Sequence, residues 1–283
     1  MNDMENMIVS GASASPEEQI KTLEQLDDMG IFMLPGESWE HFIQRVKKLL
    51  QALREIEKGI IPPPLQKNAL SWEKLPENFV AEANQLLMAA YKFSNIWAPA
   101  YFSRKETGSF AAGVQLEVDE TFPLIFLHDA FANKASFSGY NRGEVLAHEL
   151  THAARMFFPL SCYEEYFTCH LYSSSFRRLT GNFFRSKYLL ILMGAGFFLG
   201  ALLLALGNLW GVACFALPLS VVLKEILLHV KLRQAKTKLL QLNLEPLPVL
   251  LRLTDKEIFS LSKLSDREKN SLRWQVFFKK FHR

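Results

Sequence analysis

The sequence predicts an α+β protein that is mostly helical, with a small β-sheet, a two-helix transmembrane hairpin and a helical C-terminal tail. Apolar residues recur at helical spacing over both ends of the 283-residue chain. An alternating stretch and a short apolar run, both between residues 110 and 127, indicate strands. No charged residue lies between Lys187 and Lys224. These patterns divide the chain into a flexible leader at 1–15, a mixed domain at 16–187, the hairpin at 188–228 and the tail at 229–283.

The mixed domain is predicted to begin with three scaffold helices. The first starts at Ser15, which is followed by Pro16 at the first helical position and by Glu18 where a capping box requires an acidic residue. Gly30 ends this helix. The boundaries expected for the other two helices are Ser38 to about Lys58 and Pro76 to Phe93.

Two strands are predicted next. Residues from Phe110 to Val118 alternate in polarity, and Pro123 to Leu127 form a short apolar run, so the two segments are expected to pair as a hairpin. Small and polar residues at 136–141 predict a loop. A further helix is expected to begin near Arg142.

This last helix carries a motif of two histidines and a glutamate. His148 and His152 are four positions apart, so both imidazoles lie on one face of the helix and can reach one ion. Glu149 directly follows the first histidine, so its carboxylate lies beside the bound water without being a ligand. In such an HExxH arrangement zinc lowers the pKa of the water, and the glutamate takes its proton.

From the strands near Phe110 to Tyr172 the sequence resembles the zincin metallopeptidases, in particular the branch whose third zinc ligand is a glutamate on a following helix. In that branch a small residue commonly stands three positions after the glutamate, and Glu165 with Thr168 matches this pattern. The resemblance implies a zincin-like domain with Glu149 as general base and Zn²⁺ bound by three ligands, His148, His152 and Glu165.

Two other residues remain open as third ligand. Glu164 is the second choice, because it precedes Glu165 directly but has Phe167 at the position of the small residue. His170 is a rival, because zinc accepts a histidine as readily as a carboxylate.

The resemblance also implies a substrate peptide added as a strand at the edge of the sheet, and a tyrosine or histidine that stabilises the oxyanion. The run from Phe122 to Leu127 is the candidate edge strand, since Pro123 suits an unpaired rim position. The candidates for the oxyanion residue are Tyr140, Tyr163, Tyr166 and His170.

The uncharged segment is long enough for two apolar helices. Tyr188 to Leu206 and Leu209 to about Leu228 each approach the roughly 20 residues that span a bilayer, and Gly207 with Asn208 forms a natural turn. Basic residues flank both outer ends and none lies in the turn, so both flanks are expected in the cytoplasm. A wedge inserted into one leaflet is the alternative.

The tail is predicted to return to soluble character. A helix is expected to start at Thr254. In the last helix, aromatic residues share one side, and that side suits either a membrane surface or packing on the mixed domain; these residues are Trp274, Phe277, Phe278 and Phe281.

The charge and the cysteine content limit the kinds of partner and compartment that we expect. A net charge of +3 argues against a nucleic-acid binder, and the basic residues beside the apolar segment indicate lipid headgroups instead. Three cysteines form no paired framework, which fits a reducing compartment.

The function expected from these features is a membrane-anchored zinc metalloendopeptidase that acts on protein or peptide substrates. Its catalytic domain and tail would face the cytoplasm. One alternative is a membrane-anchored interaction or scaffold protein without catalysis. Another keeps the zinc for a regulatory role, in which case Glu149 would be dispensable.

Overall fold

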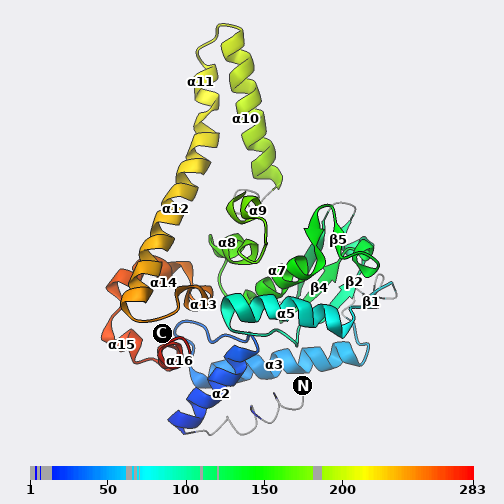
Figure 1. Ribbon diagram of the computed structural model, residues 1–283, viewed down its shortest axis with the longest axis vertical. Helices are drawn as coiled ribbons and strands as arrows, with labels where there is room; N and C mark the ends of the chain where they lie inside the picture. The colour runs from blue at the N-terminus through cyan, green and yellow to red at the C-terminus, as the bar shows by residue number, and fades with distance from the viewer. Residues whose placement is uncertain are drawn as a thin grey trace.

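The computed structural model describes Met4, Met7 and residues 15–61, 66, 69, 71–108, 111–119, 121–180 and 187–283. Most of the leader predicted at 1–15 lies outside these residues. In the described part, helices surround a four-stranded sheet, and a long helical hairpin projects from this body (Figure 1). The buried apolar residues form one core, to which both the N-terminal and the C-terminal helices contribute.

The three N-terminal helices are confirmed. Helix α2 spans Pro16–Asp28, and Ser15 and Glu18 form the expected capping box. The other two are α3 at Trp39–Glu57 and α5 at Glu77–Tyr91. Helix α3 buries one apolar face, as its periodicity requires.

The sheet contains the predicted hairpin and two strands that were not predicted. Its strands are β1 at Glu73–Lys74, β2 at Ala100–Phe102, β3 at Gly113–Val118 and β4 at Phe122–Leu127, in the order β1-β2-β4-β3. Strands β3 and β4 are antiparallel, whereas β2 runs parallel to β4. Strand β1 pairs antiparallel with β2.

The prediction that Phe122 to Leu127 forms the sheet edge is wrong. Strand β4 lies between β2 and β3, and all of its residues are buried. An unbroken apolar run is typical of a strand covered on both faces, and Pro123 is tolerated because it stands near the start of the strand. Among the described strands, the edge next to the predicted hairpin is β3.

Helix α7, at Arg142–Arg155, packs on β3 and β4, and α5 packs against α7. The polar segment predicted as a loop contains a small hairpin of β5 and β6, turning at Ser138 and Gly139, which both have positive φ. The remaining short elements of this part are α6 at Arg104–Thr107, η1 at Asp129–Ala132, β5 at Ser136–Phe137, β6 at Tyr140–Asn141, α8 at Glu164–Cys169 and α9 at Ser175–Thr180.

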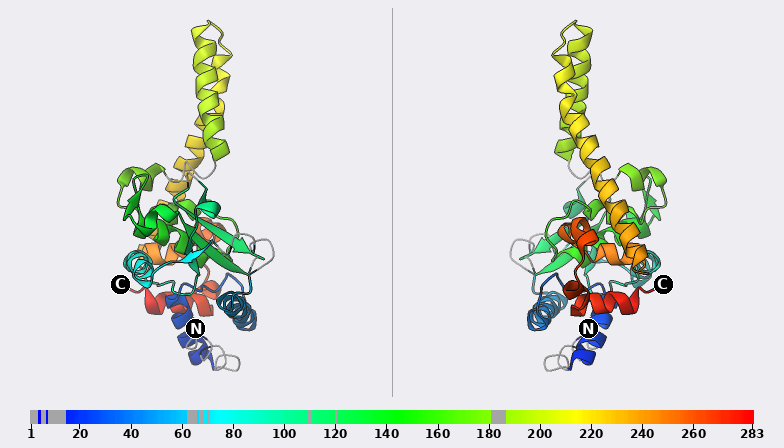
Figure 2. Two further views of the ribbon diagram at one scale, coloured as in Figure 1. Left: turned by 90° about the vertical axis from the view of Figure 1, so that its right-hand side faces the viewer. Right: turned by 90° about the vertical axis from the view of Figure 1, so that its left-hand side faces the viewer.

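The uncharged segment forms a helical hairpin. It consists of α10 at Lys187–Ala205, α11 at Gly211–Cys214 and the first part of α12 at Ala216–Gln241. The two arms are close at the tip and spread apart toward the body (Figure 1), and they overlap in both side views (Figure 2). A Cβ at Gly211 would lie 2.7 Å from the carbonyl oxygen of Gly200, so these glycines permit the close approach of the arms.

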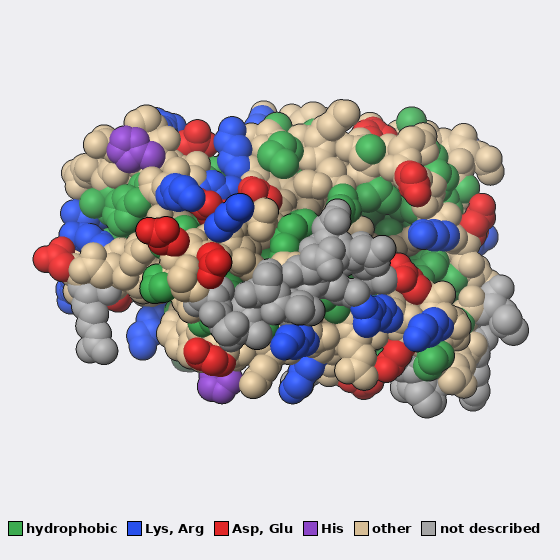
Figure 3. Space-filling model, turned by 90° about the horizontal axis from the view of Figure 1, so that it is seen from below, with side chains coloured by type: hydrophobic (Ala, Val, Ile, Leu, Met, Phe, Trp, Pro, Cys, Tyr) green, Lys and Arg blue, Asp and Glu red, His purple; other side chains and the backbone are tan. Residues whose placement is uncertain are grey.

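Within the described residues, one helical stretch is long and apolar enough to cross a membrane, by length and composition. It is Gly211–Gln241, 31 residues that comprise α11 and α12. The described apolar part of α10, Ile191–Ala205, is shorter. Large apolar side chains on the hairpin are exposed, among them Phe198 and Trp210 at 73% and 79%. The opposite end of the molecule instead presents acidic and basic side chains interspersed (Figure 3).

The C-terminal helices pack on the N-terminal ones. Trp274, Phe277 and Phe281 are buried, and α16 lies against α2, so the aromatic side of the last helix covers the core. The helices of this part are α13 at Pro246–Leu251, α14 at Asp255–Ser260, η3 at Leu261–Lys263, α15 at Asp266–Lys269 and α16 at Leu272–Lys280. The helix start expected at Thr254 is confirmed by a capping box with Glu257.

Candidate metal centre

Helix α7 places the two histidines of the motif side by side. Its first turn is capped by Asn141, whose side chain accepts hydrogen bonds from the amides of Gly143 (2.8 Å) and Glu144 (3.3 Å). One turn separates His148 from His152, and their Nε2 atoms lie 3.1 Å apart. The helix therefore directs two ligand atoms to one point.

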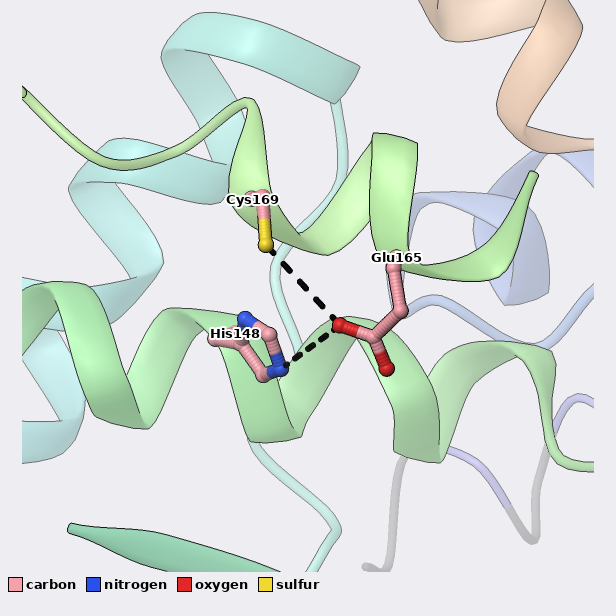
Figure 4. Close-up of side chains that lie close together, drawn as sticks. All are labelled: His148, Glu165 and Cys169. Atoms are coloured by element: carbon pink, nitrogen blue, oxygen red, sulfur yellow. Dashed lines mark hydrogen bonds and ion pairs between the residues drawn. The ribbon is translucent and has the colours of Figure 1, made fainter. Parts of the chain in front are cut away.

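Helix α8 brings a carboxylate to the same point. Oε2 of Glu165 lies 3.7 Å from Nε2 of His148, and Oε1 lies 3.6 Å from Nε2 of His152. Figure 4 shows the side chain of Glu165 reaching from α8 toward His148 on α7. The three residues that the sequence predicted as ligands are thus neighbours in the structure.

Their separations fit a single tetrahedral zinc ion. Ligand atoms about 2.0–2.1 Å from zinc lie roughly 3.3 Å from one another. Here the two Nε2 atoms are 3.1 Å apart, and each lies 3.6 or 3.7 Å from a different oxygen of the Glu165 carboxylate. Two imidazoles and a carboxylate are also a donor set that zinc accepts at catalytic sites, where the fourth position stays open. The donors and their spacing therefore suit zinc.

Glu164, the second choice as third ligand, faces away from this point. Its Oε1 lies 3.2 Å from Nδ1 of His152, and its Oε2 accepts a hydrogen bond of 2.7 Å from Nε of Arg155. Burial alone would raise the pKa of Glu164, but the charges of Arg155 and His152 outweigh it and lower the pKa to about 2. Glu164 is therefore placed to orient His152 rather than to bind the ion.

Glu149 has the surroundings expected of a general base. Its side chain is buried, and among the described residues no hydrogen bond or ion pair reaches its carboxylate. Strand β3 lies against it, since a Cβ at Gly113 would be 3.0 Å from Oε1 of Glu149. Burial raises the pKa of Glu149 to about 7, the negative charge of Glu165 adding to this and the charge of His152 opposing it.

The two histidines differ in charge. Burial, together with the charge of His152, lowers the pKa of His148 well below 6.5. Burial also acts to lower the pKa of His152, but the hydrogen bond and charge of Glu164 outweigh it and raise the pKa to about 9. Because a metal ligand must be the neutral imidazole, binding of a cation by His152 competes with its protonation.

Cys169 and Tyr172 also lie at the centre, although sequence reasoning did not select them. The Sγ atom of Cys169 lies 3.8 Å from Oε2 of Glu165, and the ring centroid of Tyr172 lies 5.6 Å from that of His148. Cys169 follows Glu165 by four positions on the same helix, so helical spacing predicts that the two side chains share a face. No local pattern marks Tyr172.

Two of the four oxyanion candidates use their hydroxyl groups elsewhere. Tyr163 donates a hydrogen bond of 2.9 Å to the carbonyl oxygen of Leu228. The hydroxyl of Tyr166 accepts a hydrogen bond of 2.7 Å from Nζ of Lys236. Both hydroxyls therefore link α8 and the residue before it to α12. The hydroxyl of Tyr163 is used as a donor, whereas that of Tyr166 still has its proton to donate.

The other two candidates contact different aromatic neighbours. The ring of His170 lies between those of Tyr91 and Tyr166, at centroid distances of 6.5 and 6.2 Å. The ring of Tyr140 lies 6.0 Å from that of Tyr172, which contacts His148. Among the described residues, the group of close metal-ligating atoms consists of His148, Glu165 and Cys169, and it includes neither His152 nor His170.

No protein-family model, curated protein or solved structure matches this chain. What the centre can do therefore follows from its own chemistry. Three donors on two adjacent helices can hold a divalent ion, and a buried carboxylate beside them can accept a proton. Together these are the parts needed for metal-assisted hydrolysis.

Proposed function

We propose that the protein is a membrane-anchored, zinc-dependent metallopeptidase with a zincin-like catalytic domain. The observation that carries this proposal is the convergence of His148, His152 and Glu165 on one point, with Glu149 buried beside them. A buried ionisable group whose pKa is raised and which lies next to three ligand atoms supports a catalytic role.

In this proposal His148, His152 and Glu165 would hold Zn²⁺. The ion would lower the pKa of a bound water and polarise the scissile carbonyl. Glu149 accepts the proton of the attacking water and passes it to the leaving nitrogen. Its raised pKa of about 7 suits both transfers near neutral pH. Glu164 holds the ring of His152 in place through Nδ1.

The substrate is a protein or peptide that pairs with β3. Among the described strands β3 is paired on one side alone, and its first residue, Gly113, contacts the side chain of Glu149. An extended peptide added along β3 would therefore bring a peptide bond toward the general base. This assignment replaces the edge strand expected from the sequence.

The hairpin anchors the catalytic domain to a lipid bilayer. Its exposed apolar side chains favour burial in hydrocarbon, and basic residues flank both of its outer ends. Both arms then cross the membrane, with the domain and the C-terminal helices in the cytoplasm.

In vesicles with the cytoplasmic face outward, an added protease should remove both regions, and protection of either region would contradict this orientation.

The deciding experiment is the metal content of the detergent-purified full chain. About one zinc per chain is expected in the wild type, with loss in His148→Ala and weakened binding in Glu165→Ala. Glu149→Gln should keep its zinc but lose hydrolysis of an unstructured protein substrate by roughly 10²-fold or more.

The same variants separate the other functions. Absence of bound metal after zinc is offered would overturn the enzyme and leave a membrane-anchored interaction protein. Bound zinc with no hydrolysis in the wild type or in Cys169→Ser, which removes the thiol next to the centre, and no effect of Glu149→Gln in either background, would indicate a regulatory zinc site.

A further inference from the structure

A thiol lies against the candidate metal centre. Cys169 is the last residue of α8, one turn beyond Glu165, and it is 95% buried, with 5% of its surface exposed. Its Sγ atom lies 3.8 Å from Oε2 of Glu165. Ligand atoms of His148, Glu165 and Cys169 all lie within 4.8 Å of one another, and Figure 4 shows the thiol pointing toward the carboxylate.

This distance is close to what a shared ion requires. Atoms bound to one tetrahedral zinc lie roughly 3.3–3.8 Å apart when sulfur is among them, and the 3.8 Å between Sγ and Oε2 of Glu165 is at the upper end of this range. Thiolate is among the strongest zinc ligands in proteins. Four side-chain ligands are typical of closed zinc sites, whereas an enzyme keeps one position for water.

We propose that Cys169 is a fourth ligand of the same ion, so that the resting protein holds zinc in a closed site of two histidines, one glutamate and one cysteine. This proposal rests on the metal site of the proposed function and adds its regulation. When Sγ binds, the S–H bond breaks, the proton goes to solvent, and the thiolate lone pair occupies the position that water needs.

The closed site is latent. Glu149 is buried beside the ion but has no water from which to take a proton. Hydrolysis requires Sγ to withdraw and recover a proton from solvent, which returns the fourth position to water. Cys169 is the last residue of α8 and lies one turn after Glu165, so in this proposal the thiol moves with the end of the helix while Glu165 stays in place.

The test replaces zinc by Co²⁺ in the detergent-purified full chain and records the absorption spectrum. A thiolate bound to Co²⁺ gives an intense charge-transfer band in the near ultraviolet, which imidazole and carboxylate ligands do not give. We expect the band in the wild type and in the control Cys214→Ser, which removes a thiol of the hairpin. We expect its loss in Cys169→Ser, with cobalt still bound at the same stoichiometry.

Three other outcomes overturn the proposal in distinguishable ways. Bound Co²⁺ without the band in the wild type leaves a three-ligand centre and the proposed function intact. A band that persists in Cys169→Ser assigns the thiolate to another cysteine. No cobalt bound to the wild type removes the metal centre itself and the proposed function with it.

At equal zinc content Cys169→Ser should also cleave peptides faster than the wild type, and an equal or slower rate would contradict latency.

Discussion

At the candidate centre, the ring of His152 is fixed by Glu164, whose carboxylate is not one of the proposed ligands. Nε2 of His152 faces the centre, while Nδ1 lies 3.2 Å from Oε1 of Glu164. The other oxygen of Glu164 is held by Arg155, whose side chain is fully buried. A carboxylate behind a ligating histidine sets its tautomer and strengthens it as a ligand.

Glu164→Gln should therefore weaken zinc binding by about 10- to 100-fold, the range found when outer partners of a ligand are removed. The buried guanidinium of Arg155 loses its ion pair as well, so the unfolding free energy should also fall. Competition with a chromogenic chelator measures the affinity. Glu144→Gln, on the same helix but hydrogen-bonded to Ser173, is the control and should bind zinc normally. Equal affinity in both variants would show that Glu164 does not support His152.

Gly113 leaves just enough room for the general base. A Cβ at this position would lie 2.7 Å from Cγ1 of Val145 and 3.0 Å from Oε1 of Glu149. Gly113→Ala should displace the carboxylate and reduce kcat/KM by on the order of 10²-fold, because small misplacements of a reacting group are costly. Gly194→Ala, with open space around its position, is the control. Zinc content should be unchanged in both, and wild-type hydrolysis in Gly113→Ala would refute the contact.

Of the residues at this centre, the sequence could predict those that share a helix face. His148, Glu149 and His152 follow from helical spacing, and Cys169 could have been found from its four-residue distance to Glu165. Gly113 and Tyr172 approach the centre through tertiary packing, which no local pattern records. The choice between Glu164 and Glu165 depends on the direction of two adjacent side chains, and the structure is needed to see it.

At the scale of elements, the C-terminal region positions the two helices of the centre. Asp255, at the start of α14, accepts hydrogen bonds of 2.6 Å from the hydroxyl of Ser161 and from the amide of Cys162. These residues lie in the connection between α7 and α8. Further along, Tyr163 bonds to the backbone of α12.

Asp255→Ala should loosen this connection and move Glu165 relative to the histidines. Loss of two hydrogen bonds to a carboxylate is expected to lower the unfolding free energy by about 1–3 kcal/mol. Denaturant titration of the metal-free protein measures this change, and chelator competition should show weaker zinc binding. Asp266→Ala removes an exposed carboxylate at the start of α15 and serves as the comparison. A stability loss without any change in zinc affinity would mean that the connection does not set the spacing of the ligands.

The elements themselves were predicted unevenly. The bounds of α2, α3 and α5 and the start of α7 agree with the structure within a few residues, whereas α12 extends to Gln241 and the second arm was expected to end at about Leu228. Strands β1 and β2 have two and three residues, too few for a pattern to appear. The hairpin of β3 and β4 was expected. Its place inside the sheet was not, because the parallel pairing of β2 with β4 joins segments that are distant in the chain.

For the whole molecule, the hairpin interrupts a body that both ends of the chain build together. Buried Arg252, beyond the hairpin, donates two hydrogen bonds to Asp27 across 225 positions of sequence, at 2.6 and 2.9 Å. Lys280 of α16 also pairs with Asp27. A sequence pattern cannot reveal this contact, because neither partner indicates the other locally. The uncharged run therefore separates two parts of the sequence that fold together into one body.

This buried cluster should make the fold sensitive to acid. Burial alone raises the pKa of Asp27, but the positive charges of Arg252 and Lys280 outweigh it and hold the pKa below 3.8 in the folded state. Because the folded pKa is below the unfolded value, the stabilisation is complete above pH 4 or so and is lost as the pH falls through the folded pKa.

Asp27→Asn leaves the buried guanidinium of Arg252 without a counter-charge, so it should lower the unfolding free energy at pH 7 by about 3–5 kcal/mol. The difference from the wild type should then shrink below pH 4, since acid protonates Asp27 in the wild type and removes the same charge. Urea titrations of the detergent-solubilised proteins between pH 7 and pH 2.5 measure both effects. Asp119→Asn replaces an exposed carboxylate and controls for the general effect of charge. A difference between Asp27→Asn and the wild type that stays constant over this range would mean that the cluster stabilises the joined ends by packing and not by charge.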